Sequence, residues 1–173
     1  MPVPKAVKRR AQKDAVAILK EDHVRVRKLL GELVKTTEKA GAKRAQLLAT
    51  IEHELKTHTQ IEEDVFYPAF RDAAERSDDR KLYYEAVEEH HVVDLVMPEI
   101  KETGTDTEQF AAKAKVLKDV VEHHAEEEET EMFPRARKLM GREELERLGA
   151  ELVKAREALS GGILDRLVGL VRP

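Results

Sequence analysis

Apolar residues recur every three or four positions in four long stretches of the chain, which is the spacing of one face of an α-helix. The four stripes are Ala15, Leu19, Val26, Leu30 and Leu33; Leu48, Ile51, Leu55 and Val65; Leu82, Ala86, Val93 and Met97; and Phe110, Ala114, Leu117 and Val121. A fifth stripe, through Leu145, Leu148, Leu152 and Leu159, predicts a further helix over 143–159. No stretch shows the pattern of a β-strand.

Short breaks separate these stretches, at Gly41, 76–79, 103–106 and Gly141. Because the connections are short, successive helices should be antiparallel neighbours. The sequence therefore predicts an all-α protein, an up-down-up-down four-helix bundle with an additional C-terminal helix. The bundle would span residues 14–140, after a basic N-terminal arm at 1–13 and before a C-terminal helix and tail at 141–173.

The ends of the chain carry two weaker patterns. Lys5, Lys8 and Arg10 belong to the basic arm, which we interpret as a solvated tail. Gly161 and Gly162 should end the fifth helix and release a short apolar segment, 163–171. That segment is too short to span a bilayer, so we expect it to cap the bundle or to self-associate.

Composition narrows the chemistry. The 173 residues include no cysteine, which excludes disulfides, iron–sulfur clusters and thiolate zinc sites and leaves His and carboxylate as the strong metal ligands. A formal net charge of −4 gives no case for nucleic-acid binding. The pattern contains neither a signal peptide nor a membrane span, so we expect a cytoplasmic protein. We expect it to be a monomer or a weak homodimer.

One motif occurs twice without gaps. His58-Thr-Gln-Ile-Glu62-Glu63, followed by Tyr67-Pro68, reappears as His124-Ala-Glu-Glu-Glu128-Glu129, followed by Phe133-Pro134. Upstream of the two copies lie Glu21-Asp22-His23 and Glu88-Glu89-His90. Each half of the chain thus supplies one lone histidine and one His-x-x-x-Glu. The matched prolines predict the same bend in both halves.

A helix brings residues four apart onto one face, so each His-x-x-x-Glu pair should point inward together. Burying such groups without compensation would cost several kcal/mol per charge. The candidate ligands for a pair of metal ions are His23, His58, Glu62, His90, His124 and Glu128. The alternative is a bundle with buried His–Glu hydrogen-bond pairs and no metal.

Neighbouring residues receive secondary roles. Asp94, one turn after His90, is a further candidate metal ligand, and Tyr67 is either a hydrogen-bond donor and catalytic residue near the metals or a core residue. Glu63 and Glu129 would accept a hydrogen bond from a ligating histidine or be solvated. The remaining histidines, His53, His91 and His123, are rotated away from the inward stripe and should lie at or near the surface.

The combined motifs, from Glu21-Asp22-His23 to His124-x-x-x-Glu128-Glu129, resemble the haemerythrin family and its bacterial HHE cation-binding domains. The resemblance implies a non-haem centre of two iron ions, with an oxo or hydroxo bridge and with Glu62 and Glu128 bridging the metals. Haemerythrins proper carry a second histidine on the third helix, where this chain has Asp94. That departure leaves an additional position open to water, hydroxide or peroxide.

These features favour a small oxygen species as the partner. Four neutral imidazoles and two carboxylates would leave a diferrous pair with a positive charge, which attracts small anionic oxygen ligands. We expect catalase-like decomposition of hydrogen peroxide ahead of the alternatives. The alternatives are reversible binding or sensing of oxygen or nitric oxide, and iron sensing or storage.

Overall fold

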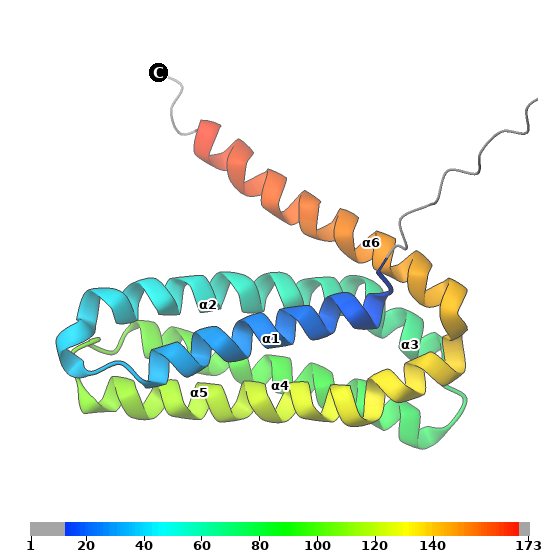
Figure 1. Ribbon diagram of the computed structural model, residues 1–173, viewed down its shortest axis with the longest axis horizontal. Helices are drawn as coiled ribbons and strands as arrows, with labels where there is room; N and C mark the ends of the chain where they lie inside the picture. The colour runs from blue at the N-terminus through cyan, green and yellow to red at the C-terminus, as the bar shows by residue number, and fades with distance from the viewer. Residues whose placement is uncertain (1–12, 170–173) are drawn as a thin grey trace, which may run out of the picture.

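A computed structural model describes residues 13–169, with side chains through residue 160. Its α-helices are α1 (Ala15–Val34), α2 (Gly41–Ile61), α3 (Tyr67–Ala73), α4 (Ser77–Lys101), α5 (Glu108–Glu127) and α6 (Phe133–Gly169). Between them lie the short helix η1 (Glu38–Ala40) and two π-helical turns, η2 (Glu62–Phe66) and η3 (Glu128–Met132). The helices α1, α2, α4 and α5 run alternately up and down side by side (Figure 1). The predicted all-α four-helix bundle is therefore confirmed.

Local hydrogen bonds fix where two of the helices begin. The side chain of Asp14 accepts a hydrogen bond from the backbone N–H of Ala17 at 2.8 Å, and Thr107 caps α5 in the same way through Phe110 at 3.1 Å. Such caps satisfy N–H groups that have no partner inside the helix.

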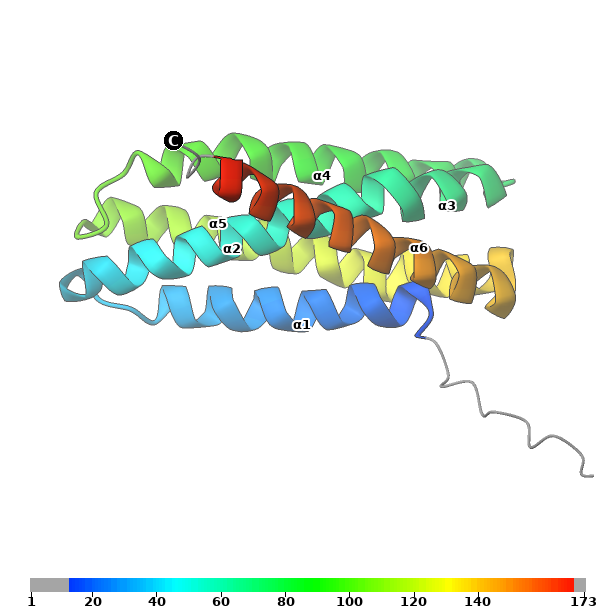
Figure 2. The same ribbon diagram turned by 90° about the horizontal axis from the view of Figure 1, so that it is seen from above.

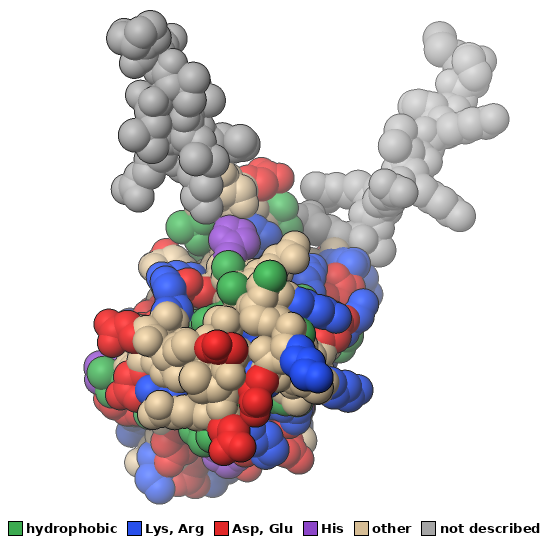
Figure 3. Space-filling view, turned by 90° about the vertical axis from the view of Figure 1, so that its left-hand side faces the viewer, with side chains coloured by type: hydrophobic (Ala, Val, Ile, Leu, Met, Phe, Trp, Pro, Cys, Tyr) green, Lys and Arg blue, Asp and Glu red, His purple; other side chains and the backbone are tan. Residues whose placement is uncertain are grey.

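The connections at one end of the bundle are tied together by a buried arginine. Arg44 donates to the backbone carbonyls of Thr36 and Thr105, which precede α2 and α5 respectively. The surface of this end is a mixture of acidic, basic and apolar side chains (Figure 3). The bundle is thus closed at its loop end by hydrogen bonds as well as by apolar packing.

The apolar core divides into two layers along the bundle. One layer surrounds Leu19, Phe66, Phe70 and Phe133, and the other surrounds Leu30, Ile51, Phe110 and Leu117. The buried histidines and glutamates of the repeated motif lie between them. Apolar side chains therefore keep bulk water away from both ends of the polar centre.

The prolines of the repeat coincide with a matched irregularity. In each half an α-helix gives way to a π-helical turn at the motif glutamate, Glu62 or Glu128, six residues before Pro68 or Pro134. The same local change thus appears in both halves. Because a π-turn holds more residues than an α-turn, the buried stripe shifts after Glu62. Phe66 is therefore fully buried, whereas Val65, which the sequence pattern placed on the stripe, is only partly buried.

The C-terminal helix differs from its prediction in length. Gly141, with φ 71° and ψ 179°, breaks the helical path within α6, as expected at the end of the bundle. Beyond it α6 crosses back over α1 and α2 (Figures 1 and 2). The helix continues to Gly169, so the expectation that Gly161 and Gly162 end it was wrong.

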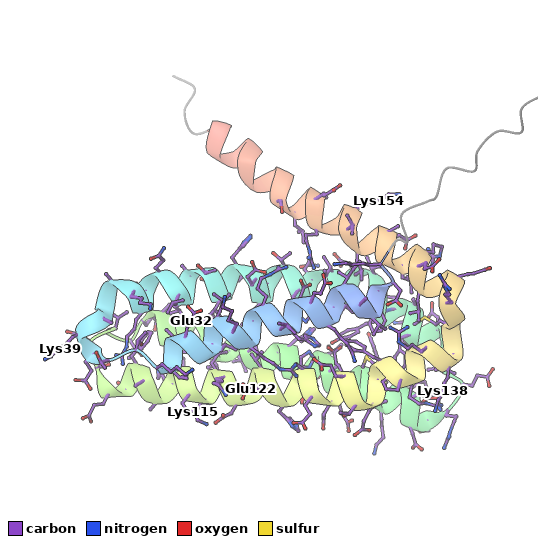
Figure 4. All side chains as sticks on the ribbon, viewed as in Figure 1. Glu32, Lys39, Lys115, Glu122, Lys138 and Lys154 are labelled. Carbon is purple, nitrogen blue, oxygen red and sulfur yellow. The ribbon has the colours of Figure 1, made fainter. Side chains whose placement is uncertain are left out.

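Two predictions concern parts outside the described residues. Residues 1–12 of the basic arm and the side chains of the apolar segment 163–171 are not described. Elsewhere, charged side chains such as Lys39, Lys115 and Lys154 project from the helices (Figure 4). None of the helices in the described part of the chain is long and apolar enough to cross a membrane.

Replacing Gly149 with alanine should destabilise the protein. A Cβ at this position of α6 would collide with the backbone carbonyl oxygen of Lys13, just before α1. Overpacking of this kind costs about 1–3 kcal/mol, measurable by urea unfolding. The control is Gly31→Ala in α1, where a Cβ meets nothing within 4 Å. It should be neutral or stabilising by up to about 1 kcal/mol. Equal effects of the two substitutions would contradict this packing of α6.

Candidate metal centre

Six buried side chains from four helical segments converge in the middle of the bundle. They are His23 on α1, His58 and Glu62 at the α2–η2 junction, His90 on α4, and His124 and Glu128 at the α5–η3 junction. Each of the six is at most 6% exposed. These are the six residues that the sequence pattern selected as candidate ligands.

The imidazoles form two pairs with Glu62 between them. The Nε2 atoms of His23 and His58 are 3.1 Å apart, and those of His90 and His124 are 3.2 Å apart. Glu62 places one oxygen 3.3 Å from His58 Nε2 and the other 3.4 Å from His90 Nε2. Its carboxylate therefore faces one imidazole of each pair.

Glu128 is placed similarly but has an additional partner. Its Oε2 lies 3.1 Å from His23 Nε2 and 3.6 Å from His124 Nε2. The hydroxyl of Tyr67 donates to the other oxygen of Glu128 at 2.9 Å. Tyr67 thus lies at the centre, with its hydroxyl 3.3 Å from His90 Nε2.

The second half of the repeat has phenylalanine at the position of Tyr67. The ring of Phe133 stacks on His23 at 5.7 Å between centroids, as Tyr67 stacks on His90 at 5.4 Å. Both aromatic rings cover an imidazole. The hydroxyl of Tyr67 is therefore a polar difference between the two halves of the centre.

A carboxylate faces the outer nitrogen of every one of the four imidazoles. The Nδ1 atoms of His23, His90 and His124 form hydrogen bonds of 2.8–2.9 Å with Glu129, Glu63 and Glu89 respectively. His58 Nδ1 lies 3.4 Å from Asp22. An N–H donated outward leaves the Nε2 lone pair free to face the centre, which is the arrangement of metal-binding histidines.

Two of these four carboxylates were missed from the sequence. Glu63 and Glu129 were anticipated as hydrogen-bond acceptors, but Asp22 and Glu89 received no role. The signal was present, because both immediately precede the lone histidine of their half. Each serves the histidine of the following His-x-x-x-Glu motif rather than its own neighbour.

The C-terminal helix reaches this network through an arginine. Arg156 of α6 forms an ion pair with Asp22, and Arg27 of α1 binds Glu129 at 2.7 Å. Asp22 is buried, so the arginine supplies a compensating charge that water cannot. The C-terminal helix α6 therefore helps to hold His58 in place through Asp22. The amphipathic sequence pattern of this helix did not reveal that role.

Burial and the close approach of the ionisable groups shift their pKa values in opposite directions. Burial and the neighbouring charge of Glu128 raise the pKa of Glu62 well above its usual value. Burial opposes the ionisation of Glu128, but His124 and His23 outweigh it and hold the pKa of Glu128 low. Burial also lowers the pKa of His58 to about 4, so this imidazole is neutral at pH 7.

Three carboxylate oxygens in the cluster have no partner. Among the described residues, both oxygens of Glu62 and Oε2 of Glu128 accept no hydrogen bond although they are buried. A buried acceptor without a donor costs about 1–3 kcal/mol, and more when charged. Cations between the imidazole pairs would satisfy these oxygens. The residues present thus fit a metal pair better than a network of His–Glu hydrogen bonds.

The remaining candidates lie outside the cluster. Asp94 is exposed at the surface between α2 and α4, and Val93 takes the inward position after His90. Asp94 is therefore not among the groups that the structure brings together. His53, His91 and His123 are exposed, as expected.

Comparisons with known proteins agree with this geometry. The model of the Hemerythrin HHE cation binding domain family matches residues 14–136. A crystal structure of a hemerythrin HHE cation binding domain-containing protein from Mycobacterium kansasii superimposes with a TM-score of 0.77 and 29% sequence identity. It covers 92% of this chain and 95% of that one.

Another similar protein is considerably longer than this chain. A protein named DNA nickase from Nostoc sp. is 25% identical over 142 residues, which are 82% of this chain and 39% of the relative. The chain thus spans about two fifths of that relative's length.

Fold and site together define a helical-bundle protein whose centre holds a His/Glu cluster suited to metal ions. The chain belongs to the Hemerythrin HHE cation binding domain family, whose model covers all six clustered residues.

Replacing Tyr67 with phenylalanine should destabilise the protein while leaving its fold intact. The substitution removes the donor to a buried oxygen of Glu128, a loss of about 1–3 kcal/mol. Chemical denaturation measures the change. The matched control is Tyr84→Phe on α4, whose side chain is 61% exposed and should tolerate the same change. Equal stability of the two variants would show that the Tyr67 hydroxyl makes no such hydrogen bond in solution.

Proposed function

We propose that the protein is a non-haem di-iron protein that acts on a small oxygen species, and that its reaction is the decomposition of hydrogen peroxide to water and oxygen. The observation that carries the proposal is the unpartnered set of carboxylate oxygens enclosed by four inward-facing imidazole nitrogens. Such a set calls for two cations rather than one, because Glu62 faces both imidazole pairs.

Iron is one of the metals that the donor set suits, and the haemerythrin resemblance selects it among them. Imidazole and carboxylate ligands without thiolate suit iron, zinc and manganese. His23, His58, Glu62 and Glu128 would hold one ion, and His90, His124 and Glu62 the other. Glu128 would be shared as well, since its Oε2 lies between His23 and His124.

The space beside the imidazoles supports a very small ligand. A cavity of about 20 Å³ is enclosed by the four histidines and by small apolar residues, among them Val26, Leu55, Val93 and Val121. A cavity needs roughly 10–15 Å³ to hold one water molecule. Peroxide, oxygen or nitric oxide is of the right size, whereas an organic substrate is not.

When bound, an iron pair supplies two-electron exchange, so two molecules of hydrogen peroxide give two of water and one of oxygen. The protein contributes position and shielding. The carboxylates at the Nδ1 atoms hold the imidazoles in orientation. Tyr67 brings a hydroxyl to the His90 side of the centre, where its oxygen can accept a hydrogen bond from a small protonated oxygen ligand while its proton is donated to Glu128. Phe66 and Phe133 keep water out.

The apolar walls of the cavity favour a second candidate, reversible binding of oxygen or nitric oxide. Anaerobically reduced, iron-loaded protein distinguishes the two. Oxygen evolution over many turnovers of added peroxide supports the enzyme. A stable coloured adduct with oxygen that bleaches on deoxygenation, without turnover of peroxide, overturns it in favour of a carrier or sensor.

Glu62→Ala and Glu128→Ala should each abolish the paired site, because each removes a carboxylate placed between the imidazole pairs. Iron per chain, measured by mass spectrometry after reconstitution, should fall below two in both variants. Glu126→Ala is the control, because Glu126 is exposed in the same segment and faces away from the centre. Two irons per chain in either variant would contradict the shared role.

Removal of metal should lower the melting temperature by several degrees. A ligand that binds only the folded state stabilises it, by about 2.7 kcal/mol at a free concentration 100 times its Kd. Differential scanning calorimetry before and after anaerobic chelation measures the shift, and reloading with ferrous iron should reverse it. An unchanged melting curve would argue against a buried metal pair.

A further inference from the structure

The outward side of α5 repeats the ligand spacing of the inward side, one residue earlier. His123 and Glu127 directly precede His124 and Glu128, so they form a second His-x-x-x-Glu pair. A shift of one residue turns a side chain by about 100° around the helix. The second pair therefore lies at the surface, where Glu89 of α4 faces it.

The separations in this trio are longer than hydrogen bonds and match the spacing of two ligands on one ion. His123 Nε2 lies 3.6 Å from Glu89 Oε1 and 3.5 Å from Glu127 Oε1. Both are longer than an N–H···O hydrogen bond. Ligands about 2.1 Å from one ion in tetrahedral geometry lie roughly 3.4 Å from each other. Inside the bundle, the same separation for His124 and Glu128 is 3.6 Å.

Charge at the trio is uncompensated. Among the side chains that the structure describes, no Lys or Arg lies within ion-pair distance of Glu89 or Glu127. The earlier acidic residues on this part of α5 have such partners, since Lys115 pairs with Asp119 and Lys118 with Glu122. The last pair in the series replaces lysine with histidine, which can bind a metal ion.

The first half of the repeat shows how a carboxylate at the position of Glu89 is paired with a positive charge. Asp22 corresponds to Glu89 in the repeat, and each faces Nδ1 of a histidine in the centre. Asp22 receives a positive charge from Arg156, whereas among the described side chains His123 is the group opposite the outer oxygen of Glu89. A bound cation would take the place at Glu89 that the arginine takes at Asp22.

We propose that Glu89, His123 and Glu127 form a surface site for a divalent transition-metal ion of the zinc or ferrous iron class. One imidazole and two carboxylates suit these ions better than calcium or magnesium, which prefer all-oxygen sites. Exposure of His123 leaves further coordination positions to water. Because Glu89 also accepts the Nδ1–H of His124 at 2.8 Å, the site is joined to the buried centre by a single carboxylate. That connection, unlike the site itself, rests on the proposed function.

Calorimetric titration of the iron-loaded full chain with zinc tests the site. The natural protein should bind one more zinc per chain than His123→Ala, with retained iron verified by mass spectrometry. His91→Ala is the matched control, because His91 is also an exposed histidine directly next to a buried one. It should keep the additional equivalent. Equal zinc binding by His123→Ala and the natural protein overturns the proposal.

A second pair of variants separates the carboxylate from general surface charge. Glu127→Gln should lose the zinc equivalent and Glu126→Gln should keep it, although both remove one negative charge from the same turn. Loss of zinc by both variants would reduce the site to unspecific attraction and overturn it.

Two further experiments test the surface site separately from the buried centre. In Glu62→Ala the surface equivalent should persist even though the buried pair is lost, and its disappearance there would contradict a separate site. In the iron-loaded natural protein, zinc should shift the visible absorption of the centre through Glu89, and His123→Ala should abolish that shift. Zinc binding without a shift overturns the connection alone.

Discussion

Burial of two carboxylates and four imidazoles at one point is the constraint on which the structure depends. Two apolar layers exclude water from both ends of this cluster, so solvation cannot stabilise its charge. Hydrogen bonds satisfy the outer nitrogens of three imidazoles, but the inner oxygens of Glu62 remain without partners in the described protein. The cluster is therefore suited to cations, and the surrounding helices keep its side chains in place.

The doubled sequence explains how one chain brings these six side chains together. Each half supplies a lone histidine, a His-x-x-x-Glu motif and two outer carboxylates. Glu63 and Glu129 each face the lone histidine of the other half, whereas Asp22 and Glu89 each face the second histidine of their own half. The differences between the halves are then informative. Tyr67 in the first half corresponds to Phe133 in the second, so only one side of the centre carries a hydroxyl at this position. Asp22 is paired with Arg156, whereas the corresponding Glu89 faces His123.

Much of this arrangement could be predicted from the sequence. Helical periodicity gave the four bundle helices, and the gapless repeat selected the six clustered residues because residues four apart share a helix face. The α-helical spacing of buried residues no longer holds where an α-helix becomes a π-helical turn. The π-helical turns after Glu62 and Glu128 shift the buried stripe, so Phe66 is buried where Val65 was expected.

Other features depend on tertiary packing and leave little trace in a linear pattern. Val93 and Asp94 lie three and four residues after His90, and helical spacing alone permits either to face inward. The rotation of α4 in the bundle decides the matter, and Asp94 is exposed. The path of α6 brings Gly149 close to the backbone of Lys13 and places Arg156 in an ion pair with Asp22.

Anomalous diffraction at the iron absorption edge, from crystals of iron-loaded protein, tests the central claim most directly. The account predicts two anomalous peaks per chain, one beside His23 and His58 and one beside His90 and His124, with Glu62 between them. A single peak would contradict the paired centre. No peak, with Glu62 and Glu128 hydrogen-bonded directly to the imidazoles, would contradict a metal centre altogether.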